Sequence, residues 1–489
     1  MYSNGFFLGF LSLLVAGTAF SCSLEHLHAQ NAEPLRPLGQ VGGDRLKLGD
    51  QFDVNGDGFL DKFERTEARR EVHAIRKKAL VDRSLRNDRN GDGVLSGDEL
   101  RSGGRRGFRR GPSLDRADTN GDGKVDPEEI GELIYQSRDR PVEGRHFEAA
   151  ERLSPQGIFE RGSGLYDEGT LRTFFFQFDD DQWMEEMQDF YRTDVPVRAD
   201  LIVDGKVYRN VGVRYRGNSS FFMVPPHLKR SLDVQMDYGD SKQRLYGYKT
   251  LNLLNAHEDP TLMREVLYSR ICREYMPAFR ANFVKVVLNG ESWGIYPNVQ
   301  QYNNDFLQDW YGSRKGVRWE GSGSLTYEGP DIGNYTNYTL KSGKASDQSW
   351  KDLIELCRIL DQVPDDQLEE ALNPVFDMDG ALWSIALENV FVDEGYLIRG
   401  SDYNLFQDGK RRFHLLQHDG NEVFNRPGGP GMPRDMVVTE LPPYYEADTM
   451  RRPVIGRLLS IPHIRARCTA HMRTIINQWL DWEKVGPLV

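Results

Sequence analysis

The segment FHLLQHDGNEVF, Phe413–Phe424, carries the feature on which the fold of the C-terminal part depends. Its apolar residues run to Leu416, and the run then ends abruptly in Asp419, Gly420 and Asn421 before an apolar pair returns. This pattern is typical of a strand that delivers a carboxylate to a site, and equally of a strand that enters an ordinary turn. The sequence on either side has to decide between the two.

The sequence before this segment changes from strand patterns to helical ones. ADLIVDGKVYRNVGVRYRG and ANFVKVVLNGESWGIYPNVQ alternate around Asp204-Gly205 and Asn289-Gly290, which predicts two hairpins. Between them, DPTLMREVLYSRICREY predicts a helix with Asp259 as its N-cap. SWKDLIELCRIL, DGALWSIALENVFVDE and the stretch 454–482 then show helical periods. A strand-rich part followed by a mostly helical part predicts an α+β body of two lobes.

Composition limits the class of protein and of partner. The 489 residues are 39% hydrophobic and 28% charged, as in a soluble globular protein, and the formal net charge is −12. Binding to phosphate backbones needs a basic face, so this charge argues against a nucleic-acid partner. Cys272, Cys357 and Cys468 lie in apolar helical patterns and are expected to be buried free thiols.

The N-terminus has the pattern of an export signal. The apolar run 6–20 is of signal-peptide length, too short to span a bilayer comfortably, and is followed by a polar segment with a cleavage position after Ala29. Residues 19–21 match a lipid-attachment box poorly, which disfavours a lipoprotein anchored at Cys22. We therefore expect 1–29 to be a signal peptide, the mature chain to be secreted or located in the cell envelope, and no transmembrane span to remain.

One pattern occurs three times in the N-terminal part: DVNGDGFLDKFE, DRNGDGVLSGDE and DTNGDGKVDPEE. Ca²⁺ takes about seven oxygen ligands at ~2.4 Å, and a tight loop presents them at alternate positions, with glycine at position six for the sharp turn. One such loop could be a solvated Asp/Asn turn, but three copies that match at every ligand position could not. They resemble EF-hands and predict a calcium-binding module over 45–136. The expected ligands, with the position-seven residue acting through its carbonyl, are Asp53, Asn55, Asp57, Phe59, Asp61 and Glu64; Asp88, Asn90, Asp92, Val94, Ser96 and Glu99; Asp118, Asn120, Asp122, Lys124, Asp126 and Glu129.

EF-hands usually pair, so three loops leave one without a partner or paired in a dimer. The stretch RSGGRRGFRRG, 101–111, lies between the second and third loops, and we expect it to separate a pair from a single hand. Calcium is abundant outside the cytoplasm, which favours weak structural sites over a cytosolic type of sensor. The sequence leaves open whether calcium acts on the rest of the chain or only folds the module.

The C-terminal body carries five motifs in a fixed order: GVRYRGNSS, KTLNLLNAHEDPTLMREVLYSRICRE, FVKVVLNGESWGIYPNVQQ, VDEGYLIRGSDYNLFQDGKRRFHLLQHDGNEVF and PVIGRLLSIPHIRAR. Together they resemble the spore-coat CotH kinase-like family, and we place this domain at 160–489. The resemblance implies a divergent, atypical protein-kinase fold of two lobes. It also implies transfer of the ATP γ-phosphoryl group to Ser or Thr hydroxyls of a protein substrate, with Mg²⁺ or Mn²⁺.

The resemblance also assigns residues of the large lobe. Asp393 matches the catalytic aspartate, which orients the attacking hydroxyl and takes its proton. Asp419 matches the metal-binding aspartate. Many family members have Trp-Asp-x-Asp there, whereas Asn421 in this chain offers an oxygen without a charge. A second metal ligand is expected at Asp402 or Asn404, and the sequence does not choose between them.

In the small lobe, GVRYRGNSS resembles the phosphate-facing segment, in which Arg214 and Arg216 would neutralise phosphate oxygens. The lysine that pairs with ATP corresponds to Lys229 or Arg230. Glu265, on the helix that follows, corresponds to the ion-pair partner of that cation.

Each of these residues has a structural alternative. Asp393 is also typical of a helix end, Asp402 and Asn404 are common turn residues, and Arg214 and Arg216 alternate as on an exposed strand face. An inactive pseudokinase, serving as a calcium-dependent binding or scaffold protein of the envelope or matrix, therefore stands beside the active kinase. A third alternative, a metal-dependent hydrolase, lacks a recognisable nucleophile arrangement or zinc spacing.

Overall fold

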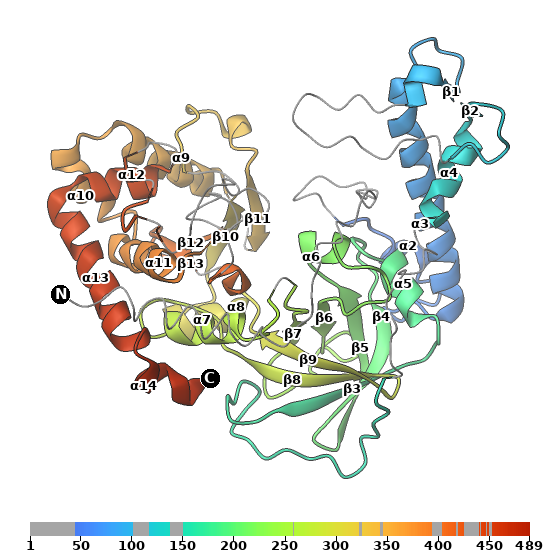
Figure 1. The fold of residues 1–489 in the computed structure, drawn as a ribbon, viewed down its shortest axis with the longest axis horizontal. Helices are drawn as coiled ribbons and strands as arrows, with labels where there is room; N and C mark the ends of the chain where they lie inside the picture. The colour runs from blue at the N-terminus through green and yellow to red at the C-terminus, as the bar shows by residue number, and fades with distance from the viewer. Residues whose placement is uncertain are drawn as a thin grey trace.

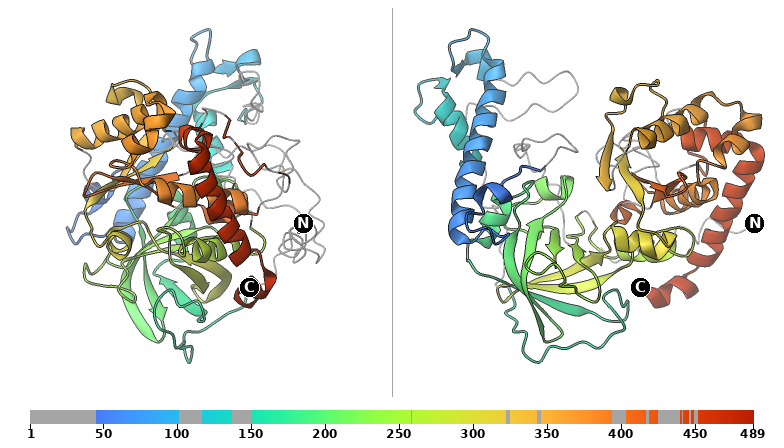
Figure 2. Two further views of the ribbon diagram at one scale, coloured as in Figure 1. Left: turned by 90° about the vertical axis from the view of Figure 1, so that its left-hand side faces the viewer. Right: turned by 180° about the vertical axis from the view of Figure 1, so that it is seen from behind.

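The computed structural model describes residues 45–100, 117–136, 150–257, 259–321, 325–342, 346–393, 403–416, 419–424, 440, 442–445, 447–448 and 452–489. The predicted signal peptide, the stretch 101–111, Asp402 and His418 lie outside these residues. The described residues form an N-terminal helical arm, a β-barrel and a mostly helical lobe (Figure 1). The arm and the helical lobe stand on opposite sides of the barrel, as the view from behind also shows (Figure 2, right).

The arm is built around one long helix, α3 (Lys62–Ser84). Its start is fixed by a capping box, because the Asp61 carboxylate accepts from the backbone N–H of Phe63 and Glu64 while the Glu64 carboxylate accepts from the N–H of Asp61. At 23 residues, α3 is roughly 35 Å long, so its two ends contact different parts of the molecule. The other elements of the arm are α2 (Gly49–Phe52), β1 (Leu95–Ser96), β2 (Lys124–Val125) and α4 (Pro127–Gln136).

The calcium loops pair differently from the expectation. The second and third loops join through β1 and β2, with Leu95 opposite Val125, and share a small apolar core at the far end of α3. The first loop lies at the other end, where Leu60 packs into the core of the barrel. The stretch 101–111 therefore connects the two members of a pair, and the single hand is the first one. Sequence distance is misleading here, because α3 carries the first loop away from the second.

The small lobe is a closed barrel in the strand order β3-β4-β5-β6-β7-β9-β8. Neighbouring strands are antiparallel except β3 and β8, whose parallel pairing closes the barrel. Both predicted hairpins are confirmed, with Asp204 and Asn289 at φ 49° and 46° in their turns. The strands and attached helices are β3 (Arg172–Phe178), α5 (Trp183–Asp189), β4 (Val197–Val203), β5 (Lys206–Tyr215), α6 (Ser219–Phe222), β6 (Leu232–Gln235), β7 (Thr250–Leu253), β8 (Ala281–Leu288) and β9 (Glu291–Val299).

The helix after β7, α7 (Arg264–Cys272), begins later than predicted. Leu262 has a φ of 61°, which interrupts the helix that would start at Pro260. The Asp259 carboxylate instead caps a turn and also accepts from the backbone N–H of Arg264 at 3.0 Å. Asp259 as N-cap was therefore wrong in position, although its carboxylate still serves the first turn of the helix.

The large lobe packs helices against a four-stranded sheet in the order β11-β10-β12-β13. The predicted helical stretch 454–482 is divided at Pro462, where a new helix begins. Cys272, Cys357 and Cys468 are buried free thiols, as predicted. The two-lobed α+β fold is thus confirmed. The elements are α8 (Asn304–Tyr311), β10 (Gly316–Gly321), β11 (Tyr338–Ser342), α9 (Asp347–Gln362), α10 (Asp365–Leu372), α11 (Met378–Phe391), β12 (Tyr403–Asp408), β13 (Phe413–Leu416), α12 (Pro453–Ser460), α13 (Pro462–Trp479) and α14 (Trp482–Val485).

Candidate functional site

Asp419 lies three residues beyond β13 and precedes a single 3-10 turn, Gly420–Glu422. Its backbone is left-handed (φ 39°, ψ 57°), a conformation that Asp adopts more readily than most residues. Its carbonyl accepts from the N–H of Glu422 at 3.0 Å, and the residue is exposed while Gly420 is buried. A hydrogen-bonded turn therefore presents this carboxylate at the surface.

Glu265 on α7 fixes this turn from the small lobe. Its Oε2 accepts from the backbone N–H of Asn421 at 3.0 Å, and only 3% of the residue is exposed. A hydrogen bond to a buried carboxylate is stronger than one between neutral groups. The position of Asp419 thus depends on the small-lobe helix as well as on β13.

Asp393 lies at the end of α11, two residues after the last helical residue. Its backbone N–H donates to the carbonyl of Glu388 at 2.8 Å, and the residue is buried. The N–H of Phe424 donates to the carbonyl of Phe391 at 2.9 Å, and the two rings lie 5.2 Å apart. The fold therefore joins the segments that carry Asp393 and Asp419 by a direct backbone hydrogen bond.

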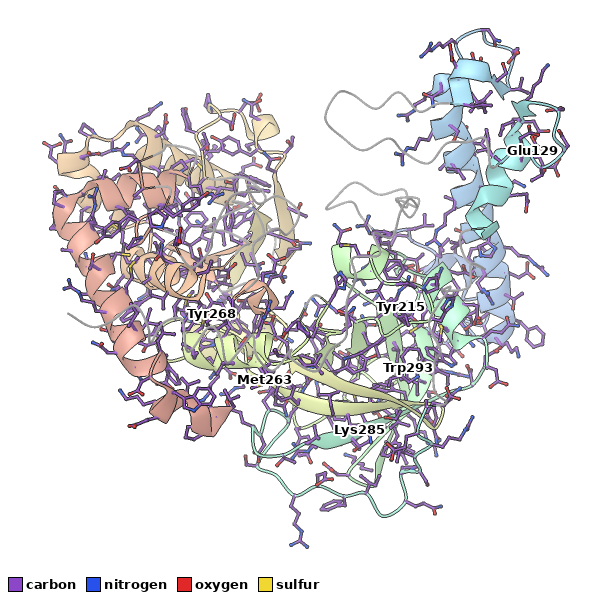
Figure 3. The ribbon with its side chains drawn as sticks, viewed as in Figure 1. Glu129, Tyr215, Met263, Tyr268, Lys285 and Trp293 are labelled. Atoms are coloured by element: carbon purple, nitrogen blue, oxygen red, sulfur yellow. The ribbon has the colours of Figure 1, made fainter. Side chains whose placement is uncertain are left out.

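Buried polar side chains lie around the end of α11. The Tyr268 ring of α7 meets Phe391 at 5.7 Å where α7 contacts the large lobe (Figure 3). Burial raises the pKa of Glu388 to about 8, although the hydrogen bond from Ser384 and the charge of Arg452 both lower it. Burial therefore favours the neutral form of Glu388.

The two candidates for the second metal ligand differ in their placement. Asp402 lies outside the described residues. Asn404 on β12 is buried, and its Oδ1 accepts from the Arg318 guanidinium of β10 at 2.7 Å. Burial lowers the pKa of Arg318 to about 10. The Asn404 oxygen is therefore already engaged by a buried cation.

Arg214 lies in β5 and Arg216 directly follows the strand, and their side chains have different environments. Arg214 is buried and pairs with Asp233 of β6 at 3.0 Å. Arg216 is partly exposed, its backbone N–H donates to the carbonyl of Ser231, and its guanidinium makes no ion pair with any residue the structure describes. Gly217 follows with a φ of 92°, a conformation that a side chain would strain. Of the two arginines, Arg216 is the one available to an anion.

Lys229 and Arg230 point to different partners. The Lys229 ammonium donates to the carbonyl of Ile295 and lies 4.4 Å from the Tyr296 ring, and burial lowers its pKa to about 8. The Arg230 guanidinium donates to the Val224 carbonyl at 2.8 Å and to Gln188 at 3.2 Å. The structure thus places Glu265 against the Asn421 amide and each of these cations against other groups.

The three calcium loops share one internal hydrogen-bond pattern. In the first, Asp53 accepts from Gly56 N, Asn55 accepts from Asp57 N, and Glu64 Oε1 accepts from Val54 N at 2.8 Å. The second and third loops repeat these bonds. The glycines at position six have φ values between 80° and 86°.

The position-twelve glutamates point into their loops rather than toward solvent. Glu64, Glu99 and Glu129 are all buried. Hydrogen bonds from the Asp126 and Thr119 amides lower the pKa of Glu129, which keeps this carboxylate ionised. The oxygen donors that these loops carry are of the type that a hard divalent cation binds.

Two residues of the site carry no signal in the sequence. Arg318 lies in an alternating strand, where an arginine usually faces solvent, and Glu388 lies in a helix of otherwise ordinary composition. Their burial depends on partners 86 and 64 residues away, Asn404 and Arg452. A single sequence does not contain that information.

Comparison with known families gives two matches. The model described as CotH kinase protein matches residues 213–489, and the model described as EF hand matches residues 50–64 and 113–134. The first match begins in the last residues of β5 and covers the rest of the small lobe and the whole large lobe, and the second covers the first and third calcium loops. Comparison with curated proteins gives no match.

In the described part of the chain, no helix has both the length and the apolar character that crossing a membrane requires.

Proposed function

The chain belongs to the CotH kinase protein family, and from this premise we propose that it is an exported calcium-binding protein whose C-terminal domain transfers the γ-phosphoryl group of ATP to Ser or Thr hydroxyls of a protein. The observation that carries the proposal is the hydrogen bond between Phe424 N and Phe391 O. This bond brings together the two segments on which phosphoryl transfer would depend. Export is supported by the apolar run 6–20.

Asp393 would orient the attacking hydroxyl and accept its proton. The bond from the substrate oxygen to phosphorus forms as the bond from phosphorus to the ADP oxygen breaks, and the proton passes to the Asp393 carboxylate and then to water. The hydrogen bond from Asp393 N to the Glu388 carbonyl supports this role, because it fixes the end of α11 that carries the carboxyl group.

Asp419 and Asn421 would hold Mg²⁺ or Mn²⁺. The donor set fits, because an exposed carboxylate and an amide oxygen in one turn are the hard ligands that these ions prefer. The bound ion would supply positive charge against the phosphate oxygens. Since Arg318 already engages Asn404, Asp402 is the better candidate for a second ligand.

In the small lobe, Arg216 would neutralise phosphate oxygens, beside the close backbone approach that Gly217 allows. Lys229 is the better candidate for the ATP-pairing cation, because Arg230 is fixed between α5 and the segment after α6. Glu265 would act by holding the Asn421 amide.

The test is nucleotide binding, measured as the thermal shift of the mature chain with ATP and Mg²⁺ or Mn²⁺ in saturating calcium. A ligand at 100 times its Kd stabilises the folded state by about 2.7 kcal/mol, a shift of several °C. We expect Asp419→Ala to abolish the shift. Asp393→Ala should keep the shift and lose phosphoryl transfer, and Asp366→Ala on the exposed face of α10 should behave as wild type. No shift in the wild type with either metal would refute the proposal.

Glu265→Gln tests the contact between the lobes. The amide side chain keeps the shape but weakens the bond to Asn421 N, and groups that support a metal ligand typically contribute 10–100-fold to affinity. We expect about a 10-fold loss in metal-dependent nucleotide affinity, measured by titration calorimetry. Glu274→Gln, which removes the same charge from an exposed site just after α7, is the matched control. Equal affinities in the two variants would contradict the assigned role.

A catalytically inactive scaffold is the alternative that one observation favours. Arg214, Lys229 and Arg230 are all engaged by protein groups, and among the described residues only Arg216 of these four has no ion-pair or hydrogen-bond partner for its side chain. For a scaffold, we expect ATP to cause no thermal shift, and we expect the chain to attach to an envelope or matrix partner only with calcium.

A further inference from the structure

The first calcium loop is in direct contact with the small lobe. Arg65 directly follows Glu64, the last ligand position of the loop, and is completely buried. Its guanidinium donates to Glu186 of α5 at 2.8 Å, to Asp179 at 3.0 Å and to the carbonyl of Leu60, inside the loop, at 3.0 Å. One side chain therefore connects the calcium loop with the wall of the barrel.

The helix α3 continues this contact along α5 and the turn after it. Arg69 pairs with the buried Asp189 at 2.8 Å, and His73 contacts the same carboxylate at 3.0 Å. One turn further, the Arg76 guanidinium donates to the backbone carbonyl of Tyr191 at 2.9 Å. The calcium helix thus holds Tyr191 by its main chain.

The side chain of Tyr191 reaches the segment proposed to face phosphate. Its hydroxyl donates to the carbonyl of Gly217 at 2.5 Å, and its ring stacks on Phe221 of α6 at 3.5 Å. The neighbouring Arg192 donates to Asn218 Oδ1 at 2.8 Å. Two consecutive residues, held on one side by the arm, therefore hold the Gly217–Phe222 segment on the other.

We propose that calcium in the first loop sets the position of the Gly217–Phe222 segment through α3 and Tyr191, and so raises the affinity for nucleotide. Tyr191 is the positioning residue. Without a cation, Asp53, Asp57, Asp61 and Glu64 repel one another at the start of α3, which loosens the helix that carries Arg65 and Arg76. The second and third loops lie at the far end of α3, with Glu129 distant from Tyr215 of the barrel (Figure 3). The predicted change in nucleotide affinity rests on the proposed function, whereas the predicted change in the position of the Gly217–Phe222 segment does not.

Hydrogen exchange at the backbone amides of 217–222 tests the structural step without nucleotide. In the full mature chain we expect calcium, compared with a chelator, to slow exchange in this segment by about 5-fold or more, the lower range of coupling between sites. Tyr191→Phe keeps the stacked ring and removes the hydroxyl, and should abolish most of the calcium effect. Arg76→Gln should do the same, and the matched control Arg70→Gln, an exposed arginine on the same helix, should not. Calcium-independent exchange in the wild type, or a full calcium effect in Tyr191→Phe, would overturn the proposal.

Binding of a non-hydrolysable Mg²⁺–ATP analogue tests the functional step. By reciprocity, the factor by which calcium raises nucleotide affinity equals the factor by which nucleotide raises calcium affinity at the first loop. We expect a factor of about 5 or more in the wild type and near 1 in Tyr191→Phe. Calcium-dependent exchange without any nucleotide binding would uphold the coupling and refute the kinase assignment. Nucleotide binding with a factor of 1 in the wild type would refute the coupling alone.

Discussion

Glu388 shows how a single buried residue determines the pH dependence of stability. Its carboxyl group accepts from the Ser384 hydroxyl, Arg452 lies near it, and Tyr268 and Cys272 of α7 face it together with Asp393. Its Oε2 has no hydrogen-bond partner within the described part of the chain. Burial therefore favours the neutral form, and the pKa rises to about 8.

This pKa predicts a loss of stability as the pH rises. Between about pH 5 and pH 8 the folded protein keeps a proton that the unfolded chain releases, so the free energy of unfolding falls by about 1.4 kcal/mol per pH unit from this group. Glu388→Gln should remove that slope and make the variant more stable than wild type at pH 8. Urea unfolding at several pH values measures this. The control is Glu370→Gln on the exposed face of α10, and a variant curve parallel to that of the wild type would disprove the prediction.

The residues of the candidate site were predictable to different degrees. Asp393 and Asp419 stand at the ends of a helix and a strand, where a change of pattern marks them in the sequence. The resemblance predicts a cation as the partner of Glu265, and the structure shows a hydrogen bond from Asn421 N to its carboxylate that the sequence did not indicate. Such a contact joins residues 156 positions apart, and local pattern contains no information on that pairing.

At the scale of elements, α3 belongs to two bodies at once. Ala68 and Val72 in its first half, together with Leu60 just before it, pack into the core of the barrel, and its last residues contact the paired hands. The four strands of the two predicted hairpins follow from alternation, whereas β3 has six of its seven residues buried and does not alternate. Its parallel pairing with β8, which joins Arg172 with Val284, has no local signal. The sequence therefore predicts the hairpins, but neither the closure of the barrel nor the helix that covers it.

The ion pair of Arg65 and Glu186 predicts how strongly α3 is attached. Removing one partner of a buried ion pair typically costs 3–5 kcal/mol, since the other charge stays buried and uncompensated. We expect Arg65→Met to lower the free energy of unfolding by about 3 kcal/mol in saturating calcium. Burial raises the pKa of Glu186 against the charges of Arg65 and Arg69, so the loss should shrink as the pH falls and Glu186 takes up a proton.

Arg70→Met is the matched control for this prediction. Arg70 lies on the same helix and pairs with Glu67 at the surface, where an ion pair contributes about 0–1 kcal/mol. Thermal or urea unfolding followed by tryptophan fluorescence compares the two variants. Similar losses in both would show that the buried pair does not attach the helix.

The described residues form four apolar cores: one in the large lobe, one shared by the barrel and the first hand, one where β8 and β9 of the barrel meet α8, β12 and β13, and one in the paired hands. Because Leu60 belongs to the barrel core, a boundary between the calcium module and the CotH domain at residue 136 describes the sequence motifs but not the packing. The first hand is part of the small lobe, whereas the other two hands form a satellite at the end of α3.

This division predicts that calcium stabilises the barrel of the CotH domain through one loop. Binding to the folded state alone stabilises it by about 2.7 kcal/mol at 100 times the Kd, and the gain goes to the core that the loop belongs to. In calorimetry with calcium, Asp53→Ala should lower the Tm of the barrel transition by several °C, toward the value of wild type in chelator. Asp118→Ala should leave that transition unchanged and weaken only the paired hands, whose core is formed by five buried residues. Equal effects of the two substitutions on the Tm of the barrel transition would contradict this prediction. All three hands would then act as one unit, with α3 transmitting the loss of calcium at its far end to the barrel.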